Sequence, residues 1–348
     1  MHKNILHIIS STQWRGGEQQ VHYLLNADYK TITTFLFCPE NAAILKKYNK
    51  QPNSIFTYKK RFGADIIAAF QLKKICKLHK IDILHIHDSH GLNTFLLATL
   101  LGLELPVIFH RHVNFPIHSK WKYNNKHLQK IIAVSETVKE NIASFIDVSK
   151  IEVINPCIDI LKYSSIKNPI LRTELNIPAS HKIIGIVAAI EQEKNIEAFL
   201  QIANYFENKS DYQFVVIGDG SLLETLKVKY NKPTIHFVGF RNDVEKLLPD
   251  VDVFLFTSAN EGFGMVLLEA MASEVPVITT NFKASTEIIL SEKNGYIVNN
   301  QTEMIEKLDI LLTNENLRKT IIENARNFVQ HYDVKMMIDK IEAVYQQL

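Results

Sequence analysis

Two glutamates eight residues apart, Glu261 and Glu269, lie in the stretch NEGFGMVLLEAMA at residues 260–272. Gly262 and Gly264 permit backbone angles that other residues avoid, which places Glu261 in a tight turn after an apolar strand. The residues from 265 to 272 then predict a helix, whose N-terminal amides and positive dipole end suit a diphosphate. Glu261 can meet the group beyond the phosphate, and Glu269 can accept hydrogen bonds from ribose hydroxyls. Taken alone, the two glutamates fit an exposed pair at an ordinary turn better; the rest of the chain favours the ligand site.

Glycines and histidines follow the expected strands of the first half. Gly16 and Gly17 precede a helix expected to begin near Gln19, and they can let backbone amides approach a phosphate or a sugar. Alternate strand residues point to opposite faces, so a shared metal site on these strands is not expected. We predict no metal and expect hydrogen bonding to a sugar, with burial in the core as the alternative for His85. The residues concerned, at the ends of the expected strands 83–86 and 107–109, are His85, His87, Asp88, His90, His110, Arg111 and His112.

Basic and aromatic residues follow the expected strands of the second half. Lys194 is expected at a turn between a strand and a helix, where its ammonium can neutralise a departing diphosphate. Phe240 and Arg241 follow another strand and can hold a nucleobase. Asp250 and Asp252 form a DxD pattern but open an apolar strand, so we interpret them as structural. The chain contains neither GxGxxG nor GxxxxGK[ST], which counts against a dehydrogenase and against P-loop phosphoryl transfer.

Short apolar runs alternate with longer amphipathic segments along the whole chain. Strands that are apolar throughout indicate parallel sheets covered by helices on both faces. The pattern predicts an α/β protein with two doubly wound, Rossmann-like domains facing a central cleft, joined where prolines appear and apolar density falls. The expected strands cover residues 5–9, 33–37, 83–86, 107–109, 131–134 and 153–154, then 183–189, 214–217, 235–238, 251–256, 275–279 and 296–298.

Composition and charge are those of a globular protein whose two halves carry net charges of opposite sign. Of 348 residues, 46% are hydrophobic and 22% charged, and the net charge is +2. Residues 1–165 hold 21 Lys and Arg against 12 Asp and Glu, whereas the remainder holds 18 against 25. The basic half, with Lys120, Trp121, Lys122 and Tyr123, can face an anionic acceptor or membrane; a solvated basic surface is the alternative. Three separated cysteines and the absence of a long apolar segment predict a cytoplasmic protein.

The chain resembles glycosyltransferase family 4, retaining enzymes of the GT-B fold, over nearly its whole length. Gly16-Gly17, the stretch VVIGDG at 215–220, the stretch VGFR at 238–241, and above all the E-x7-E motif from Glu261 to Glu269 carry the resemblance. The stretch RHVNFP at 111–116 resembles members that build bacterial lipopolysaccharide and related surface glycans.

The resemblance implies roles for individual residues. It implies that Glu261 contacts the donor sugar, Glu269 the ribose, Lys194 the diphosphate and His112 the reacting sugar, without a metal or other cofactor. Donor contacts are also implied for Gly16, Gly17, Phe240, Arg241, Gly262, Phe263 and Gly264. It implies an acceptor-binding domain at 1–164, a donor-binding domain at 165–330, and a C-terminal helix at 331–348 that returns to the first domain.

Two positions depart from the family pattern. Ala189 stands where the family usually has an arginine five residues before the lysine, so half of the cationic clamp is missing. Lys194 alone, or Arg15, Arg111 or Arg241, must then serve. The stretch KASTE at 283–287 also stands where a glycine pair is common.

The sequence therefore predicts a metal-independent, retaining transfer of a hexosyl unit from a UDP- or GDP-sugar to a glycan or lipid-linked acceptor. We expect the protein in the cytoplasm, with contact to the inner face of the membrane and no nucleic-acid partner. The alternatives are a nucleotide-sugar epimerase or hydrolase of the same fold, and a non-catalytic nucleotide-sugar-binding subunit, which the missing arginine supports.

Overall fold

The structure is a computed structural model of the 348-residue chain. It describes residues 2–48, 54–61, 65–115, 117, 119–165 and 170–348. Pro116, in the stretch at 111–116, lies outside them. The chain forms two compact units, one made of Met1–Cys157 with Val334–Leu348, the other of Ile158–Asp333. The first unit's main segment thus ends a few residues before the predicted domain end at 164, and the second unit ends a few residues after the predicted domain end at 330.

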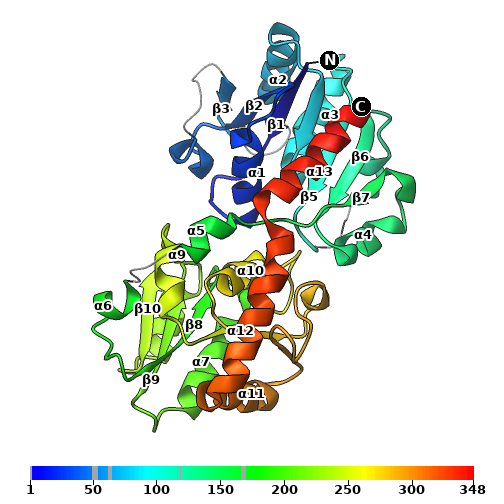
Figure 1. Cartoon of the computed structure of the whole chain (residues 1–348). Helices are drawn as coiled ribbons and strands as arrows, with labels where there is room; N and C mark the ends of the chain where they lie inside the picture. Colours follow the sequence, from blue (N-terminus) through cyan, green and yellow to red (C-terminus); the bar gives the residue numbers. More distant parts are fainter. Residues whose placement is uncertain (1, 49–53, 62–64, 116, 118, 166–169) are drawn as a thin grey trace. The chain divides into compact units, whose positions relative to one another are not determined.

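The first unit is built on a seven-stranded parallel sheet in the order β3-β2-β1-β4-β5-β6-β7 (Figure 1). Its strands are β1 (Lys3–Ile8), β2 (Ile32–Pro39), β3 (Ile55–Tyr58), β4 (Ile83–Ile86), β5 (Val107–Arg111), β6 (Leu128–Ala133) and β7 (Ile151–Val153). Its helices are α1 (Gly16–Asn26), α2 (Ile66–Leu78), α3 (Ser89–Leu100), α4 (Glu136–Ala143) and α13 (Val334–Gln347), with 3₁₀ turns η1 (Ala43–Lys46), η3 (Lys120–Asn124) and η4 (Val148–Lys150).

The second unit is built on a six-stranded parallel sheet in the order β10-β9-β8-β11-β12-β13. Its strands are β8 (Lys182–Val187), β9 (Tyr212–Ile217), β10 (Ile235–Gly239), β11 (Val253–Phe256), β12 (Val277–Thr280) and β13 (Tyr296–Val298). Its helices are α5 (Ile160–Ser164), α6 (Leu171–Glu174), α7 (Ile196–Tyr205), α8 (Leu223–Lys229), α9 (Val244–Leu247), α10 (Met265–Ala272), α11 (Gln301–Thr313) and α12 (Glu315–Val329). Its described residues also form the 3₁₀ turns η5 (Gln192–Lys194), η6 (Leu248–Asp250), η7 (Ser285–Glu287) and η8 (Gln330–Tyr332).

The prediction of two doubly wound parallel domains is confirmed. Each expected apolar run overlaps a strand, and the central strands are largely buried, as parallel strands covered on both faces require, whereas the edge strand β10 has one buried residue, Ile235. Two details were wrong. β3 was not predicted, and α1 begins at Gly16 rather than near Gln19, where the Glu18 carboxylate accepts a hydrogen bond from the Arg15 N–H at 3.1 Å.

The C-terminal helix α13 belongs to the first unit, which confirms the predicted return of the chain. Met337, Ile341, Val344 and Tyr345 form its buried face. The Lys3 ammonium donates to the carbonyl of Tyr345 at 2.7 Å, which ties the helix to the start of β1. In the described part of the chain, no helix is long and apolar enough to cross a membrane.

Candidate functional site

The turn that carries Glu261 and the helix that carries Glu269 follow one another as predicted. β11 ends at Phe256 and α10 begins at Met265, immediately after Gly264. Gly264 has φ +104°, in the left-handed region that favours glycine, and a Cβ there would lie 3.2 Å from the Phe282 ring. The N-terminal amides of α10 therefore open at the carboxyl end of the sheet, where doubly wound folds bind their ligands.

Lys194 and Glu261 meet at this end of the sheet. The ammonium nitrogen of Lys194 lies 2.6 Å from Oε1 of Glu261, and the side chains are 22% and 14% exposed. The segment after β11 also holds the lysine's own backbone, because Thr257 Oγ1 donates to the carbonyl of Lys194 at 3.2 Å. The Ala259 N–H donates to the carbonyl of Glu193 at 3.0 Å. A fixed cation therefore stands beside a carboxylate at the end of two adjacent strands.

Two glycines after β9 bring that strand's loop against the loop that carries Lys194. A Cβ on Gly218 would lie 1.8 Å from the carbonyl oxygen of Ala188, and one on Gly220 would lie 2.4 Å from that of Ile190. The Ile190 N–H donates to the carbonyl of Asp219 at 2.9 Å. The GDG stretch at 218–220 therefore acts as a close-packing device that fixes the path of the chain toward Lys194.

The other predicted donor residues have different environments. Glu269 is 9% exposed within α10, and Phe263 is 3% exposed with its ring 5.8 Å from that of Tyr332. Phe240 is 53% exposed. Gly262 lies in the turn that leads to α10.

The three arginines that could replace the family's arginine at position 189 differ in how far their guanidinium groups are already occupied by other contacts. Arg241 donates to both oxygens of Asp243, at 2.8 and 2.9 Å, and to Glu174; this pairing raises the pKa of Arg241. Arg111 is buried, its pKa is lowered by that burial, and it donates to Tyr123 and to the carbonyl of Phe115. Arg15 is exposed.

In the first unit, Gly17 and His112 lie together. A Cβ on Gly17 would lie 3.5 Å from Cγ of His112, so the start of α1 packs directly on the imidazole. The pKa of Glu18, in the same turn, is raised mainly by burial. Gly17 and His112 thus form one predicted set, and Lys194 and Glu261 form another in the other unit.

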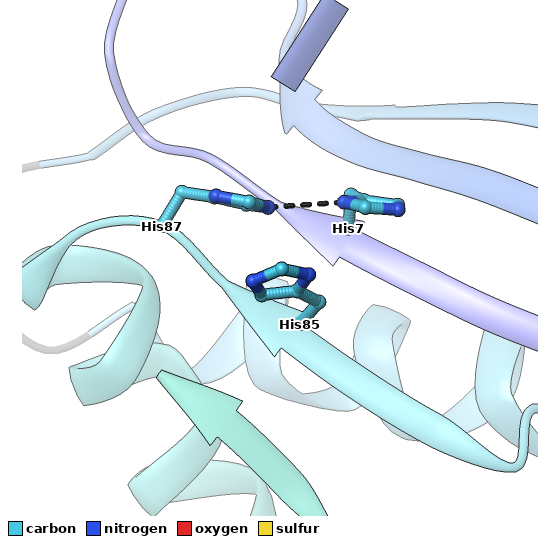
Figure 2. Close-up of side chains that lie close together, drawn as sticks. All are labelled: His7, His85 and His87. Atoms are coloured by element: carbon cyan, nitrogen blue, oxygen red, sulfur yellow. Dashed lines mark hydrogen bonds between the residues drawn. The ribbon is translucent and has the colours of Figure 1, made fainter. Parts of the chain in front are cut away.

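Five histidines gather at the carboxyl ends of β1, β4 and β5: His7, His85, His87, His110 and His112. All but His112 are buried. Burial lowers the pKa of His7 to about 3 and of His112 to about 4, and holds the other three well below their ordinary value. These rings are therefore neutral near pH 7. Figure 2 shows three of them, with His7 and His87 joined by a hydrogen bond.

Sequence reasoning missed His7 and Tyr345. The parallel register pairs His7 with His85 across β1 and β4, and Tyr345 lies 2.6 Å from Nδ1 of His85 through its hydroxyl. The available signal was the position of His7 in the first strand, one strand away from the two histidines of β4. His90 is the second residue of α3 and lies outside the group of five.

Potential ligand atoms of two histidine triplets lie within 4.8 Å of one another: those of His7, His85 and His87, and those of His87, His110 and His112. Asp88 instead caps α3, accepting from the Gly91 N–H at 2.8 Å. Asp250 and Asp252 accept from Arg172 and from the start of β8, as their structural interpretation predicted.

Two family models match the chain in succession. Residues 14–161 match Glycosyltransferase Family 4, and residues 167–328 match Glycosyl transferases group 1. The chain belongs to glycosyltransferase family 4. It is thus a glycosyltransferase of the retaining type that uses a nucleotide-sugar donor.

Similar proteins include bacterial surface-glycan enzymes. The UDP-Gal:alpha-D-GlcNAc-diphosphoundecaprenol alpha-1,3-galactosyltransferase of Escherichia coli is 26% identical over 81% of this chain and 79% of its own length. The N,N'-diacetylbacillosaminyl-diphospho-undecaprenol alpha-1,3-N-acetylgalactosaminyltransferase of Campylobacter jejuni is 25% identical over 80% of each chain. Among solved structures, Anabaena Alr3699/HepE in complex with UDP-glucose has a TM-score of 0.86 at 18% identity, with both chains covered completely. This likeness shows the GT-B fold.

Proposed function

We propose that this family 4 enzyme transfers a hexosyl unit, with retention, from a UDP- or GDP-sugar to a glycan or lipid-linked acceptor of a bacterial surface polysaccharide or lipopolysaccharide. The observation that carries the proposal is the Lys194–Glu261 pair at the sheet end where α10 begins. The relatives support the class of acceptor, because two of them are named for undecaprenol-linked diphosphate substrates.

The proposed chemistry is stabilisation of the leaving group. As the glycosidic bond of the donor breaks, negative charge accumulates on the diphosphate. The Lys194 ammonium and the amides at the start of α10 stabilise that charge more in the transition state than in the ground state. Without donor, Glu261 holds the ammonium at 2.6 Å and so keeps it in place before binding.

We assign the remaining roles from the family pattern. Glu269 binds the ribose, Glu261 the donor sugar and His112 the reacting sugar, with Gly17 packed beside that imidazole. In this assignment residues 165–330 bind the donor, residues 1–164 bind the acceptor, and no metal takes part. Arg241 already bonds two carboxylates, so Lys194 and the helix dipole supply the phosphate charge.

We also propose that the protein works in the cytoplasm, at the inner face of the membrane. Trp121 is 67% exposed in η3, between two lysines, and the first half of the chain carries the basic excess. An exposed aromatic ring among basic residues suits an anionic lipid interface.

A transfer assay tests the function. The protein is incubated with UDP- and GDP-hexoses, with and without an undecaprenyl-diphosphate sugar acceptor, and products are followed by mass spectrometry and NMR of the anomeric proton. We expect acceptor-dependent transfer with the donor's anomeric configuration. Turnover that needs no acceptor supports an epimerase or hydrolase instead. Binding without turnover supports the non-catalytic subunit that the alanine at position 189 suggests.

A further inference from the structure

Three of the five clustered histidines are aligned in a continuous row. Nδ1 of His7 lies 3.0 Å from Nε2 of His87, and Nδ1 of His87 lies 3.3 Å from Nε2 of His112. The ring centroids are 5.2 and 5.6 Å apart. Each centroid separation exceeds the nitrogen separation by about two imidazole radii, so the nitrogens point straight at one another.

This alignment is that of hydrogen bonds rather than of metal ligands. In a tetrahedral zinc site two ligand nitrogens lie about 3.3 Å apart and direct their lone pairs to an ion off the line that joins them, whereas nitrogens that point straight at one another would need about 4 Å to hold an ion on that line. The His110 and His112 rings are stacked, with centroids 4.1 Å apart and planes inclined by 22°. Rings stacked in this way direct their in-plane lone pairs side by side rather than toward one point.

Proton accounting gives the row a direction. A neutral imidazole carries one N–H, so all three rings must donate in the same sense. If His112 donated toward His7, the remaining proton of His7 would sit on Nε2, which is buried without a partner. Buried N–H groups without an acceptor are rarer than unpaired acceptors. His7 therefore donates to His87, and His87 donates to Nε2 of His112.

We propose that His7 and His87 are positioning residues that form an imidazole relay and fix His112 as the tautomer protonated on Nδ1. Nδ1 of His112 has no protein partner in the described part of the chain, so this N–H is directed to a ligand oxygen. His85 packs against His87, with ring centroids 4.2 Å apart, and supports the position of the His87 ring. The hydroxyl of Tyr345 lies 2.6 Å from Nδ1 of His85 and holds that ring in turn.

The relay deepens the proposed function, since His112 is the residue proposed to contact the reacting sugar. An N–H donor at a fixed angle can hydrogen-bond the ring or hydroxyl oxygen of a sugar. In a mixture of tautomers, His112 would carry the donating proton on Nδ1 only part of the time. Chained hydrogen bonds also polarise one another, which strengthens the outer donor.

The test uses ¹⁵N-histidine-labelled full-length protein without donor, and reads the tautomers from two-bond ¹H–¹⁵N correlations of the imidazoles at pH 7.5. His112 signals are assigned with His112→Gln. We expect the proton on Nδ1 of His112 in the parent. In both His7→Phe and His87→Leu we expect a mixture of His112 tautomers. His7→Phe is the sharper variant, because His7 hydrogen-bonds His87 and not His112. His110→Phe keeps a ring stacked on His112 and removes no hydrogen bond, so it should leave the tautomer unchanged.

The matching kinetic result is a loss of about tenfold in kcat/KM for His7→Phe and His87→Leu, as for other outer partners that orient a functional histidine. Should either variant fail to fold, His87→Gln provides the smaller change. A proton on Nε2 of His112 in the parent, or the same tautomer in His7→Phe, overturns the relay. Stoichiometric metal in the purified protein that His87→Leu removes overturns it too. A fixed tautomer in a protein without transfer activity instead rejects the proposed function and leaves the relay standing.

Discussion

Replacing Gly218 by alanine should displace the loop that leads to Lys194. The new Cβ would lie 1.8 Å from the carbonyl oxygen of Ala188, far inside van der Waals contact, so the two backbones must separate by more than about 1 Å. Gly218 also has φ +150°, a conformation that side chains rarely adopt. Overpacking costs about 1–3 kcal/mol and backbone strain a further 1–3, which gives about 4 kcal/mol for the substitution.

Gly239 provides the matched control. It has φ +77°, and nothing lies within 4 Å of a Cβ placed there. Gly239→Ala should therefore cost only the backbone strain, about 1–2 kcal/mol. Both glycines lie at strand ends in the same unit, joined by a hydrogen bond from the Gly218 N–H to the carbonyl of Gly239 at 2.9 Å.

The assay is differential scanning calorimetry with and without saturating donor nucleotide. For a unit of this size, about 4 kcal/mol lowers the Tm of its transition by roughly 8–16 °C, against a few degrees for Gly239→Ala. Stabilisation by the nucleotide should weaken in Gly218→Ala because the backbone that positions Lys194 moves. Equal Tm values for the two variants would refute the close-packing argument.

Three further outcomes follow from individual residues. Lys194→Ala should lower turnover at least about tenfold, because a preorganised cation is lost, whereas Lys232→Ala, which removes a surface pair, should not; unchanged turnover would remove Lys194 from the mechanism. Burial lowers the pKa of His7 to about 3 in the folded protein, below the ordinary 6.5 of the unfolded chain. Above pH 6.5 the imidazole is neutral in both states, so the contribution of His7 to stability is complete there. The free energy of unfolding should then fall by about 1.4 kcal/mol per pH unit for each such histidine as the pH drops below 6.5. Urea melts of the parent and His7→Phe at pH 7.5 and 5.5 measure this, and equal pH slopes would contradict it. Trp121→Ser should reduce sedimentation with anionic vesicles, whereas Val228→Ser should not, although Val228 is the more exposed residue and lies in the other unit; equal loss in both argues against the lipid contact.

The fold could be predicted because parallel strands buried on both faces read as continuous apolar runs. β3 was not predicted because Ile55–Tyr58 is a four-residue strand at the edge of the sheet, where it pairs with β2 and where burial and length give little periodic signal. The return of α13 could be predicted from its apolar stripe, whose Met337, Ile341 and Val344 are buried.

The site was less accessible to sequence reasoning. The turn at Glu261 and the helix after Gly264 follow from local glycine chemistry, but the contact between Glu261 and Lys194 depends on β8 and β11 being neighbours in the sheet. The row of histidines depends likewise on the register that sets His7 against His85. Strand order and register are tertiary properties, and a single sequence does not contain the pairings that define them.

Donor binding is the decisive measurement for a nucleotide-sugar site built around α10. Thermal unfolding of the parent, of Glu269→Ala and of the exposed-residue control Glu323→Ala should be followed with UDP-, GDP- and ADP-sugars. Saturating ligand stabilises a protein by about 3 kcal/mol at a hundred times its Kd, so a Tm rise of several degrees is expected for UDP- or GDP-sugars. We expect this rise to persist in Glu323→Ala and to disappear in Glu269→Ala. An equal rise in all three proteins, or none in the parent, would contradict it.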